Sequence, residues 1–279
     1  MIGKGPRRRT GERATPWPLA VPAALAVAFL LLPLLAMVVR APWRDLPRIL
    51  VEAQALSALR LSLVCATAAT AICLVVGVPL AWVLARSPSR WVTPLRGLVT
   101  LPLVLPPVVG GVALLIAFGR RGIAGQYLYA AFGIQLPFTT AGVVVAETFV
   151  AMPFLVVTVE GALRSADTGL EEAAAILGAR RFTTFRRVTL PLVAPSVAAG
   201  SVLCWARALG EFGATITFAG NLPGVTQTLP LAVYGAFEND PPAAVALSLV
   251  LLAVCVGVLA LLRDRWLRPG WGSQTGTAL

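Results

Sequence analysis

The chain has 279 residues, of which 58% are hydrophobic and only 13% are charged, whereas a soluble protein is about 45–50% apolar and about 25% charged. This composition excludes an ordinary water-soluble fold. It predicts an all-α membrane protein, because the apolar residues come in blocks of roughly twenty or more, which cross the hydrocarbon layer as helices. The net charge is +11, and the basic residues that produce it lie mostly between these blocks. No nucleic-acid-binding pattern accompanies them, so we expect no nucleic acid partner.

The sequence also lacks the residues that metal or acid–base catalysis commonly uses. It contains no histidine, the commonest metal ligand and the usual proton shuttle at neutral pH. Its four cysteines lie inside apolar blocks and form no C-x-x-C pair of the kind that binds zinc. We therefore expect no metal site, no cofactor and no catalytic residues in this chain.

Six apolar blocks follow one another along the chain. The first comes after a tail with five Lys and Arg residues. It is longer than the roughly 7–15 apolar residues of a signal peptide, so we interpret it as a retained span. Prolines within or near several blocks predict kinks or interruptions. The six predicted transmembrane helices cover approximately residues 19–39, 57–85, 97–118, 138–163, 192–219 and 241–262.

The distribution of Lys and Arg between the loops predicts the orientation. With the N-terminus inside the cell, alternate loops and tails hold sixteen basic residues on the cytoplasmic side and five on the other. Because basic loops remain on the cytoplasmic side, both termini are expected in the cytoplasm. We divide the chain into a basic cytoplasmic tail at 1–18, a single transmembrane domain at 19–262 with a cytoplasmic loop at 164–191, and a cytoplasmic C-terminal tail at 263–279.

The loop at 164–191 contains a predicted amphipathic helix. Thr168 and Glu171 have the S/T-x-x-E spacing of a capping box, and Gly178 stands where a left-handed C-terminal cap would lie. Two interpretations are open, namely a helix packed on its own membrane domain or at the lipid surface, and a docking helix for a partner protein. Apolar residues recur at i, i+3, i+4 and i+7 and form one face, which consists of Leu170, Ala173, Ala174 and Leu177.

The docking interpretation rests on the chemistry of this helix. The alanines of its apolar face allow a partner surface to approach closely, while Glu171 and Glu172 remain available for polar contacts. Basic residues flank the helix on the membrane side and can fix its depth against anionic lipid. These residues are Arg180, Arg181, Arg186 and Arg187.

The same loop resembles a known signature. Glu172-Ala173-Ala174, followed by Gly178 and then by Val188-Thr189-Leu190-Pro191, is similar to the EAA motif of permease subunits of bacterial binding-protein-dependent ABC importers, with Val where the pattern usually has Ile. The resemblance implies a type I importer permease fold. In that family the loop forms a coupling helix, which sits in a cleft of the ATP-hydrolysing subunit. The implied coupling residues are Glu171, Glu172, Ala173, Ala174, Leu177 and Gly178.

A second stretch narrows the resemblance. Residues 207–234, which begin Arg-Ala-Leu-Gly-Glu-Phe-Gly, are similar to the fifth span and outer loop of molybdate permease subunits and less closely to those of sulfate permeases. Residues 79–82, 105–110 and 119–122 fit the same group, and the likeness covers roughly residues 55–262. It implies import of molybdate across the bacterial inner membrane. Tungstate and sulfate are alternatives, because all three are tetrahedral dianions.

The resemblance also implies partners. The chain contains no G-x-x-x-x-G-K-[ST] sequence of the kind that cradles ATP phosphates, so Mg-ATP is expected on a separate ATPase. A complete importer would combine two copies of this chain, two ATPase subunits and an extracytoplasmic oxyanion-binding protein, surrounded by membrane lipid. The rival from another class is an ion-gradient-driven secondary transporter, which would need no ATPase and would leave the capped helix without a purpose.

Charged residues inside the predicted spans are functional candidates, because charges are costly in a membrane. Glu147, Arg207 and Glu211 are expected at comparable depth. Arg207 and Glu211 are four residues apart on one predicted helix, which favours an ion pair that Glu147 is placed to share. The cluster either holds the fourth and fifth spans together or lines the translocation path or its gate. The nearby Gly213 favours close helix packing or hinge motion.

Overall fold

The computed structural model describes residues 17–266, and every regular element in this range is a helix. The chain divides into two compact units, residues 1–41 and residues 42–279. The first unit contains helix α1 (Trp17–Val39), which has no buried residue. The predicted tails at 1–18 and 263–279 fall almost wholly outside the described residues.

The second unit is built around three long helices, α3 (Ala53–Arg86), α7 (Thr140–Ser165) and α10 (Leu190–Leu209). Small residues line their interfaces, because Ala, Cys and Gly let helix backbones approach closely inside a membrane. At Gly200 an added Cβ would lie only 3.1 Å from Cδ1 of Leu155. The buried core of these helices includes Ala66, Ala69, Cys73, Leu155, Val159, Leu163, Cys204 and Ala208.

The third predicted span, over 97–118, is broken, as the prolines within it predicted. Helix α4 (Val92–Val104) and helix α5 (Pro107–Phe118) are bent by 119° at the break. Leu105 and Pro106 have extended backbone there, because each precedes a proline and is therefore disfavoured in the α region. Within the described residues this leaves five long apolar helices, or six candidate spans if the bent pair is counted as one.

The fifth predicted span, over 192–219, is also divided. Helix α9 (Arg181–Thr184) and a π-helical turn, η1 (Phe185–Thr189), lead directly into α10. Helix α10 ends at Leu209, and the short helix α11 (Gly213–Phe218) begins after a break of three residues. Arg207 and Glu211 were predicted to lie on one helix, but α10 ends before Glu211.

Helix α11 packs closely against α5, and glycines make this possible. A Cβ placed on Gly213 would lie 2.9 Å from Cβ of Pro107, and one placed on Gly111 would lie 2.7 Å from Cβ of Thr217. Side chains larger than hydrogen would push the two short helices apart. The structure therefore places Gly213 at a close contact between two broken spans.

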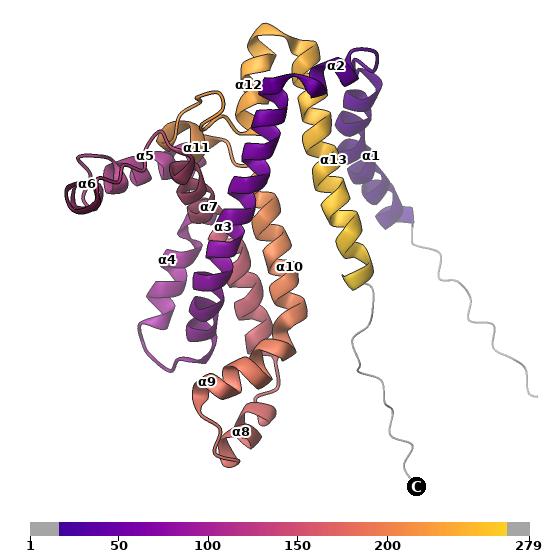
Figure 1. Cartoon of the computed structure of the whole chain (residues 1–279). Coiled ribbons are helices and arrows are strands. Elements are labelled where there is room, and N and C mark those ends of the chain that lie inside the picture. The colour runs from indigo at the N-terminus through magenta and orange to yellow at the C-terminus, as the bar shows by residue number, and fades with distance from the viewer. Residues whose placement is uncertain (1–16, 267–279) are drawn as a thin grey trace, which may run out of the picture. The chain divides into compact units, whose positions relative to one another are not determined.

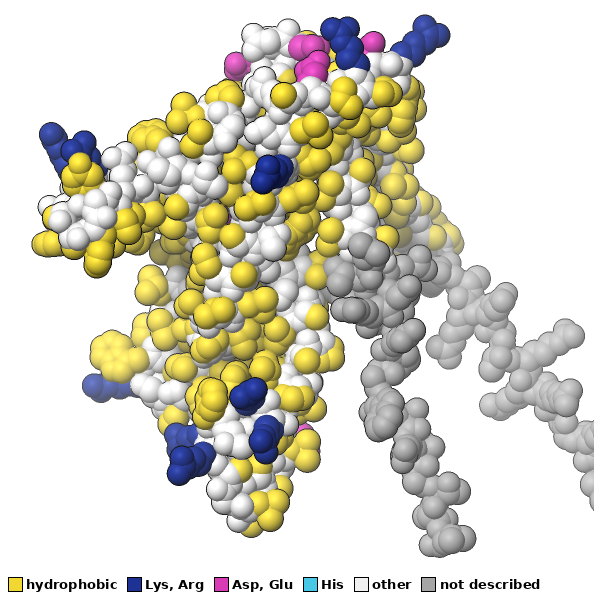
Figure 2. Space-filling view, in the orientation of Figure 1, with side chains coloured by type: hydrophobic (Ala, Val, Ile, Leu, Met, Phe, Trp, Pro, Cys, Tyr) yellow, Lys and Arg dark blue, Asp and Glu magenta, His cyan; other side chains and the backbone are white. Residues whose placement is uncertain are grey.

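The remaining helices lie toward the two ends or the side of the second unit. Figure 1 shows α2 and α12 at one end, which we call the outer end, and α8 and α9 at the other, which we call the inner end. In Figure 2, Arg side chains gather around α8 and α9, whereas most visible acidic side chains lie at the outer end. The inner end was predicted to be cytoplasmic from the number of Lys and Arg residues in its loops and tails alone. The helices not bounded above are α2 (Leu46–Val51), α6 (Gly125–Phe132), α8 (Gly169–Ile176), α12 (Leu229–Asn239) and α13 (Pro241–Trp266).

Candidate functional site

The predicted cytoplasmic helix exists as α8, but its N-terminus is not the capping box that the sequence suggested. Thr168 is the N-cap residue and makes no side-chain cap hydrogen bond. Instead the backbone N–H of Gly169 donates to Oδ1 of Asp167 at 2.9 Å, and the Thr168 hydroxyl lies 3.4 Å from Oε1 of Glu172. The Glu171 side chain is turned away from the helix start.

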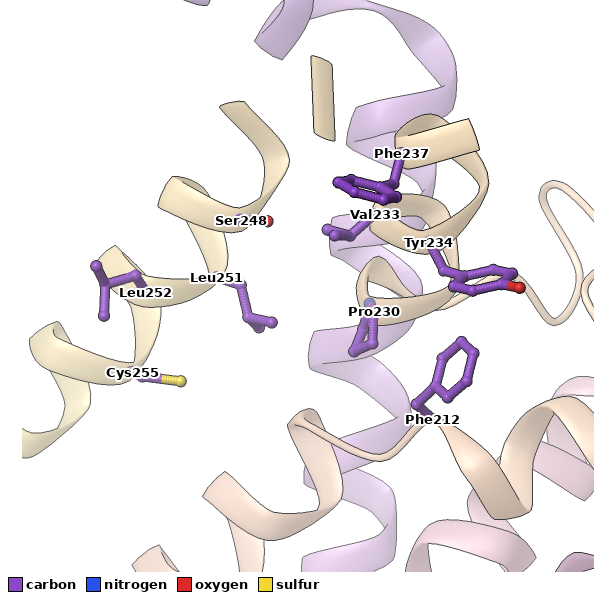
Figure 3. Close-up of a pocket in the computed structure, with 9 residues that line it drawn as sticks. All are labelled: Phe212, Pro230, Val233, Tyr234, Phe237, Ser248, Leu251, Leu252 and Cys255. Atoms are coloured by element: carbon purple, nitrogen blue, oxygen red, sulfur yellow. The ribbon is translucent and has the colours of Figure 1, made fainter. Parts of the chain in front are cut away.

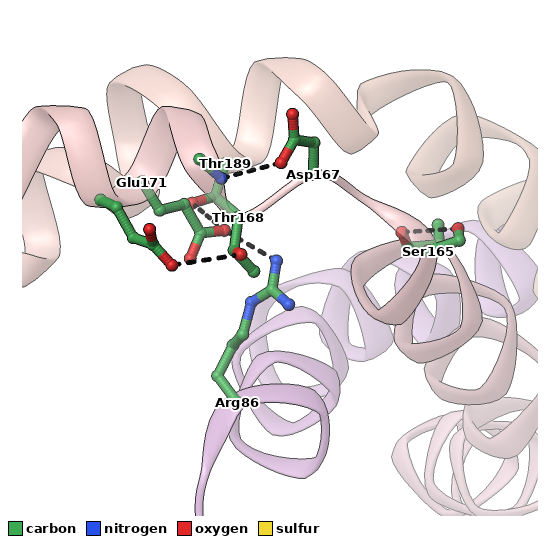
Figure 4. Close-up of polar contacts among 9 residues, drawn as sticks. Arg86, Ser165, Asp167, Thr168, Glu171 and Thr189 are labelled. Carbon is green, nitrogen blue, oxygen red and sulfur yellow. Dashed lines mark hydrogen bonds and ion pairs between the residues drawn. The ribbon is translucent and has the colours of Figure 1, made fainter.

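The carboxylate of Glu171 instead makes two contacts outside its own helix (Figure 4). Nη2 of Arg86, the last residue of α3, donates to Oε1 of Glu171 at 3.0 Å. The hydroxyl of Thr189, the last residue of η1, donates to the same oxygen at 3.1 Å. A guanidinium donor is charged and a backbone amide is not, so the Glu171 carboxylate bonds to Arg86 and Thr189 and does not reach back to the start of its helix.

The C-terminus of α8 follows the prediction. Gly178 has φ +81°, the left-handed conformation that favours glycine. Its N–H donates to the carbonyl of Ala175, and the N–H of Ala179 donates to the carbonyl of Ala174, each at 3.0 Å. This pair of bonds is a Schellman cap, so the helix is closed at this end by its own backbone.

The apolar side chains of α8 and of the following turn are exposed to an unusual degree. Ile176 and Leu177 are 86% and 87% exposed, and Phe182 is 73% exposed. No residue of α8 is buried, which does not fit a helix packed on its own membrane domain. Neighbouring exposed apolar residues such as Ile176 and Leu177 indicate a surface that another molecule covers. Ile176 belongs to this surface, although the predicted apolar face did not include it.

The intramembrane charges are arranged in part as predicted. Nη1 of Arg207 lies 2.7 Å from Oε2 of Glu211, and the Glu211 side chain is only 1% exposed. The two residues do not lie on one continuous helix, because α10 ends at Leu209. Glu211 sits in the break before α11, where its Oε1 accepts a hydrogen bond from the N–H of Ala214 at 2.7 Å. The Glu211 carboxylate thus contacts one residue of α10 and one residue of α11, on the two sides of the break.

Glu147 does not share this ion pair. It lies on α7 with its side chain buried, and its Oε2 has no hydrogen-bond partner among the described residues. In the described range Arg207 therefore pairs with Glu211 and not with Glu147.

A second ionic network at the inner end has no counterpart in the sequence prediction. Oε1 of Glu160 lies 2.8 Å from Nε of Arg96 and 3.0 Å from Nε of Arg164. Arg96 also donates to the carbonyl of Leu84 at 3.2 Å. The network joins α3, α4 and α7. Only the i,i+4 spacing of Glu160 and Arg164 could have signalled it.

An apolar pocket of about 560 Å³ lies between α12 and α13 (Figure 3). Its lining carries the hydroxyls of Tyr234 and Ser248, and that of Ser248 donates to the carbonyl of Ala244 within its own helix. No charged side chain lines the pocket, so it offers nothing that would recognise an oxyanion. Its lining consists of Phe212, Pro230, Val233, Tyr234, Phe237, Ser248, Leu251, Leu252 and Cys255. In the described range no group of three or more His, Cys, Asp or Glu could hold a metal ion.

The arrangement of broken spans around an exposed loop helix is the fold of an ABC importer permease. A crystal structure of a bacterial ABC transporter involved in the import of the acidic polysaccharide alginate matches with a TM-score of 0.73 at 17% identity, over 91% of this chain and 96% of that one. The MetNI methionine ABC transporter in an inward-facing conformation matches with a TM-score of 0.59 at 18% identity, over 76% and 93%.

The sequence comparison shows the family. Residues 77–270 match the model of the binding-protein-dependent transport system inner membrane component, and the chain belongs to this family. It is 53% identical to the molybdenum transport system permease protein ModB of Mycobacterium tuberculosis over 86% of this chain and 90% of that protein. Its identity to ModB of Escherichia coli is 41%, over 75% and 92%. Its identity to the sulfate transport system permease protein CysT of Salmonella typhimurium is 37%, over 82% and 84%.

Proposed function

We propose that this chain is the transmembrane subunit of an ATP-driven importer that carries molybdate across the bacterial inner membrane. The observation that supports the mechanism is α8, a capped helix at the inner end whose large apolar side chains are exposed. The substrate is inferred from relatives named as molybdenum permeases, which share up to 53% identity with the chain. Tungstate and, less closely, sulfate are the alternatives within the family.

In this proposal α8 is the coupling helix and inserts into a separate ATPase subunit, where Mg-ATP is bound and hydrolysed. The exposed Ile176 and Leu177 supply the apolar contact, and the exposed Glu172 in the first turn supplies the polar one. The Schellman cap at Gly178 keeps the helix formed at the end that enters the partner. The predicted coupling residues keep their roles, namely Glu171, Glu172, Ala173, Ala174, Leu177 and Gly178.

The working assembly in this proposal contains two copies of the chain, two ATPase subunits and an extracytoplasmic binding protein that delivers the oxyanion. Membrane lipid surrounds the spans, and the exposed arginines near α9 contact its anionic headgroups. A solved relative of the same fold is described in complex with an alginate-bound periplasmic protein, which supports delivery from outside. No nucleic acid takes part.

We place the translocation path or its gate at Glu147, Arg207, Glu211 and Gly213. Glu211 balances the charge of Arg207, so the cluster would bind an oxyanion only weakly. Weak binding suits a permease that receives its substrate from a capture protein and must release it. The break between α10 and α11, closed by Glu211, is the part of this cluster that can change shape.

Co-purification tests the proposal. The tagged chain is extracted from its native membrane in mild detergent and identified with its companions by mass spectrometry. We expect an ATP-binding cassette ATPase to accompany it and to show vanadate-sensitive hydrolysis that a molybdate-loaded binding protein stimulates. A chain that purifies alone and transports without ATP would support the secondary transporter instead.

A further inference from the structure

Three segments that are far apart in the sequence meet at a single carboxylate oxygen at the inner end. Oε1 of Glu171 accepts from Arg86, 85 positions earlier, and from Thr189, 18 positions later. Arg86 is the last residue of α3, and Thr189 immediately precedes α10. The loop helix is therefore tied to the inner ends of two of the three core helices (Figure 4).

The contacts are sheltered from water. The Arg86 and Glu171 side chains are 16% and 19% exposed, and Thr189 is 1% exposed. Exposed ion pairs contribute little, because water and salt screen them. A pair that is largely shielded and that also accepts a buried hydroxyl is screened less and has a more defined geometry.

These contacts are also the principal polar link between α8 and the membrane helices. The other polar contacts that residues at the start of α8 make in the described part of the chain are local, between Thr168 and Glu172 and between Asp167 and Gly169. The chain on either side of the helix bends at the extended Ala166 and at the left-handed Gly178. Without the Glu171 contacts, α8 would be held to the core by these bends and by the short helix α9.

We propose that Arg86 and Thr189 are positioning residues, which hold Glu171 so that α8 moves as one body with α3 and α10. This inference rests on the proposed docking of α8 on an ATPase. A displacement of α8 then passes through Arg86 to α3 and through Thr189 to α10, both of which line the packed core. The π-helical turn that carries Thr189 is a local irregularity of a kind often found at functional sites.

The experiment is a double-mutant cycle on the complete importer in liposomes, with molybdate as the probe. The variants are Arg86→Gln, Glu171→Gln and the double variant, and the readout is the amount of molybdate taken up per ATP hydrolysed. Each single variant is expected to lower this ratio about fivefold or more, and the double variant is expected to be no worse than either, because contacting residues are not additive. Damage to folding alone would lower uptake and hydrolysis together and leave the ratio unchanged.

We call the contacts of Glu171 with Arg86 and Thr189 the clamp. Matched controls separate the loss of the clamp from a general loss of charge or packing. Arg90→Gln removes an exposed arginine from the next loop at the same end and should leave the ratio unchanged. Thr189→Val keeps the volume but removes the hydroxyl, and we expect it to lower the ratio. Thr189→Ser keeps the hydroxyl and should retain the wild-type ratio of molybdate uptake to ATP hydrolysis.

The outcomes distinguish this inference from the proposed function. A wild-type chain that brings no ATPase would overturn the docking proposal and the clamp with it. A coupled wild type whose Arg86→Gln and Glu171→Gln variants retain the normal ratio would overturn the clamp alone. Losses that multiply in the double variant would do the same, since they would show that the two side chains act independently.

Discussion

The carboxylates of the second unit that are wholly or partly shielded from water differ in the donors that surround them. Glu171 accepts from Arg86 and Thr189, and Glu211 pairs with Arg207 and accepts from the N–H of Ala214. A buried charge is tolerated when it is paired and hydrogen-bonded, and it becomes strongly destabilising when one partner is removed. Among Glu147, Arg207 and Glu211, a substitution of Arg207 is therefore expected to lower stability most.

Arg207→Ala should lower the free energy of unfolding by about 1–3 kcal/mol, because it leaves the Glu211 carboxylate buried without its cation. Thermal unfolding of the purified protein in detergent measures the effect. Arg207→Lys keeps the charge and should lose less. Equal melting temperatures for wild type and Arg207→Ala would show that the ion pair contributes nothing to stability.

Gly213→Ala should destabilise the chain by roughly 1–3 kcal/mol, because the added methyl group overpacks the contact with α5. Its Cβ would lie 2.9 Å from Cβ of Pro107, closer than carbon atoms approach. Gly161→Ala is the matched control, since a Cβ at that position meets nothing within 4 Å. The comparison again uses thermal unfolding. A Gly213→Ala protein as stable as Gly161→Ala would contradict the close packing.

The single residues show where sequence reasoning stops. Charges inside apolar runs are conspicuous, so Glu147, Arg207 and Glu211 could be named without a structure. Arg86 and Thr189 could not be linked to Glu171, because their contacts span 85 and 18 positions and follow no helical spacing. The capping-box prediction failed for the same reason, since a distant arginine competes for the carboxylate that the local pattern assigned to the helix start.

At the scale of elements, α8 has few side-chain ties to the membrane helices and exposes its apolar tip. The helix is closed at Gly178 by its own backbone and held at Glu171 by distant side chains. Its exposed residues are therefore free to serve a contact outside the chain. A substitution there should affect that contact without affecting the fold.

Ala173→Arg should abolish molybdate uptake while leaving membrane insertion intact, because Ala173 is exposed on α8 and a long cation would block close docking. The measurement pairs uptake in cells with the amount of protein in the membrane fraction. Thr93→Arg adds the same charge to an exposed site near the start of α4 and serves as the control. Normal uptake by a well-expressed Ala173→Arg protein would remove α8 from the coupling role.

The elements also show which breaks composition can and cannot reveal. Hydropathy located every candidate span, since apolar length alone decides whether a helix can cross the membrane. It did not place the bend of 119° at Leu105 and Pro106, although the Pro-Pro pair signalled an interruption. The end of α10 at Leu209 follows from the packing of α11 on α5 through Gly213, a contact between segments about a hundred residues apart.

At the scale of the whole molecule, the architecture consists of two units, and the second contains α8, the broken spans and the intramembrane charges. Family membership and the importer permease fold, both expected from the EAA-like loop, are confirmed by the match over residues 77–270 and by the solved relatives. The predicted coupling residues and path residues stay predictions. In the proposed function their roles depend on an ATPase and on an extracytoplasmic binding protein.

The most direct test of ATP-driven import uses proteoliposomes that contain the chain with its co-purified ATPase. Radioactive molybdate is supplied with the binding protein on the outer side, and ATP is supplied on the side of α8. The account predicts accumulation of molybdate that requires ATP and stops with vanadate. Accumulation that persists without the ATPase and follows an imposed ion gradient would contradict it.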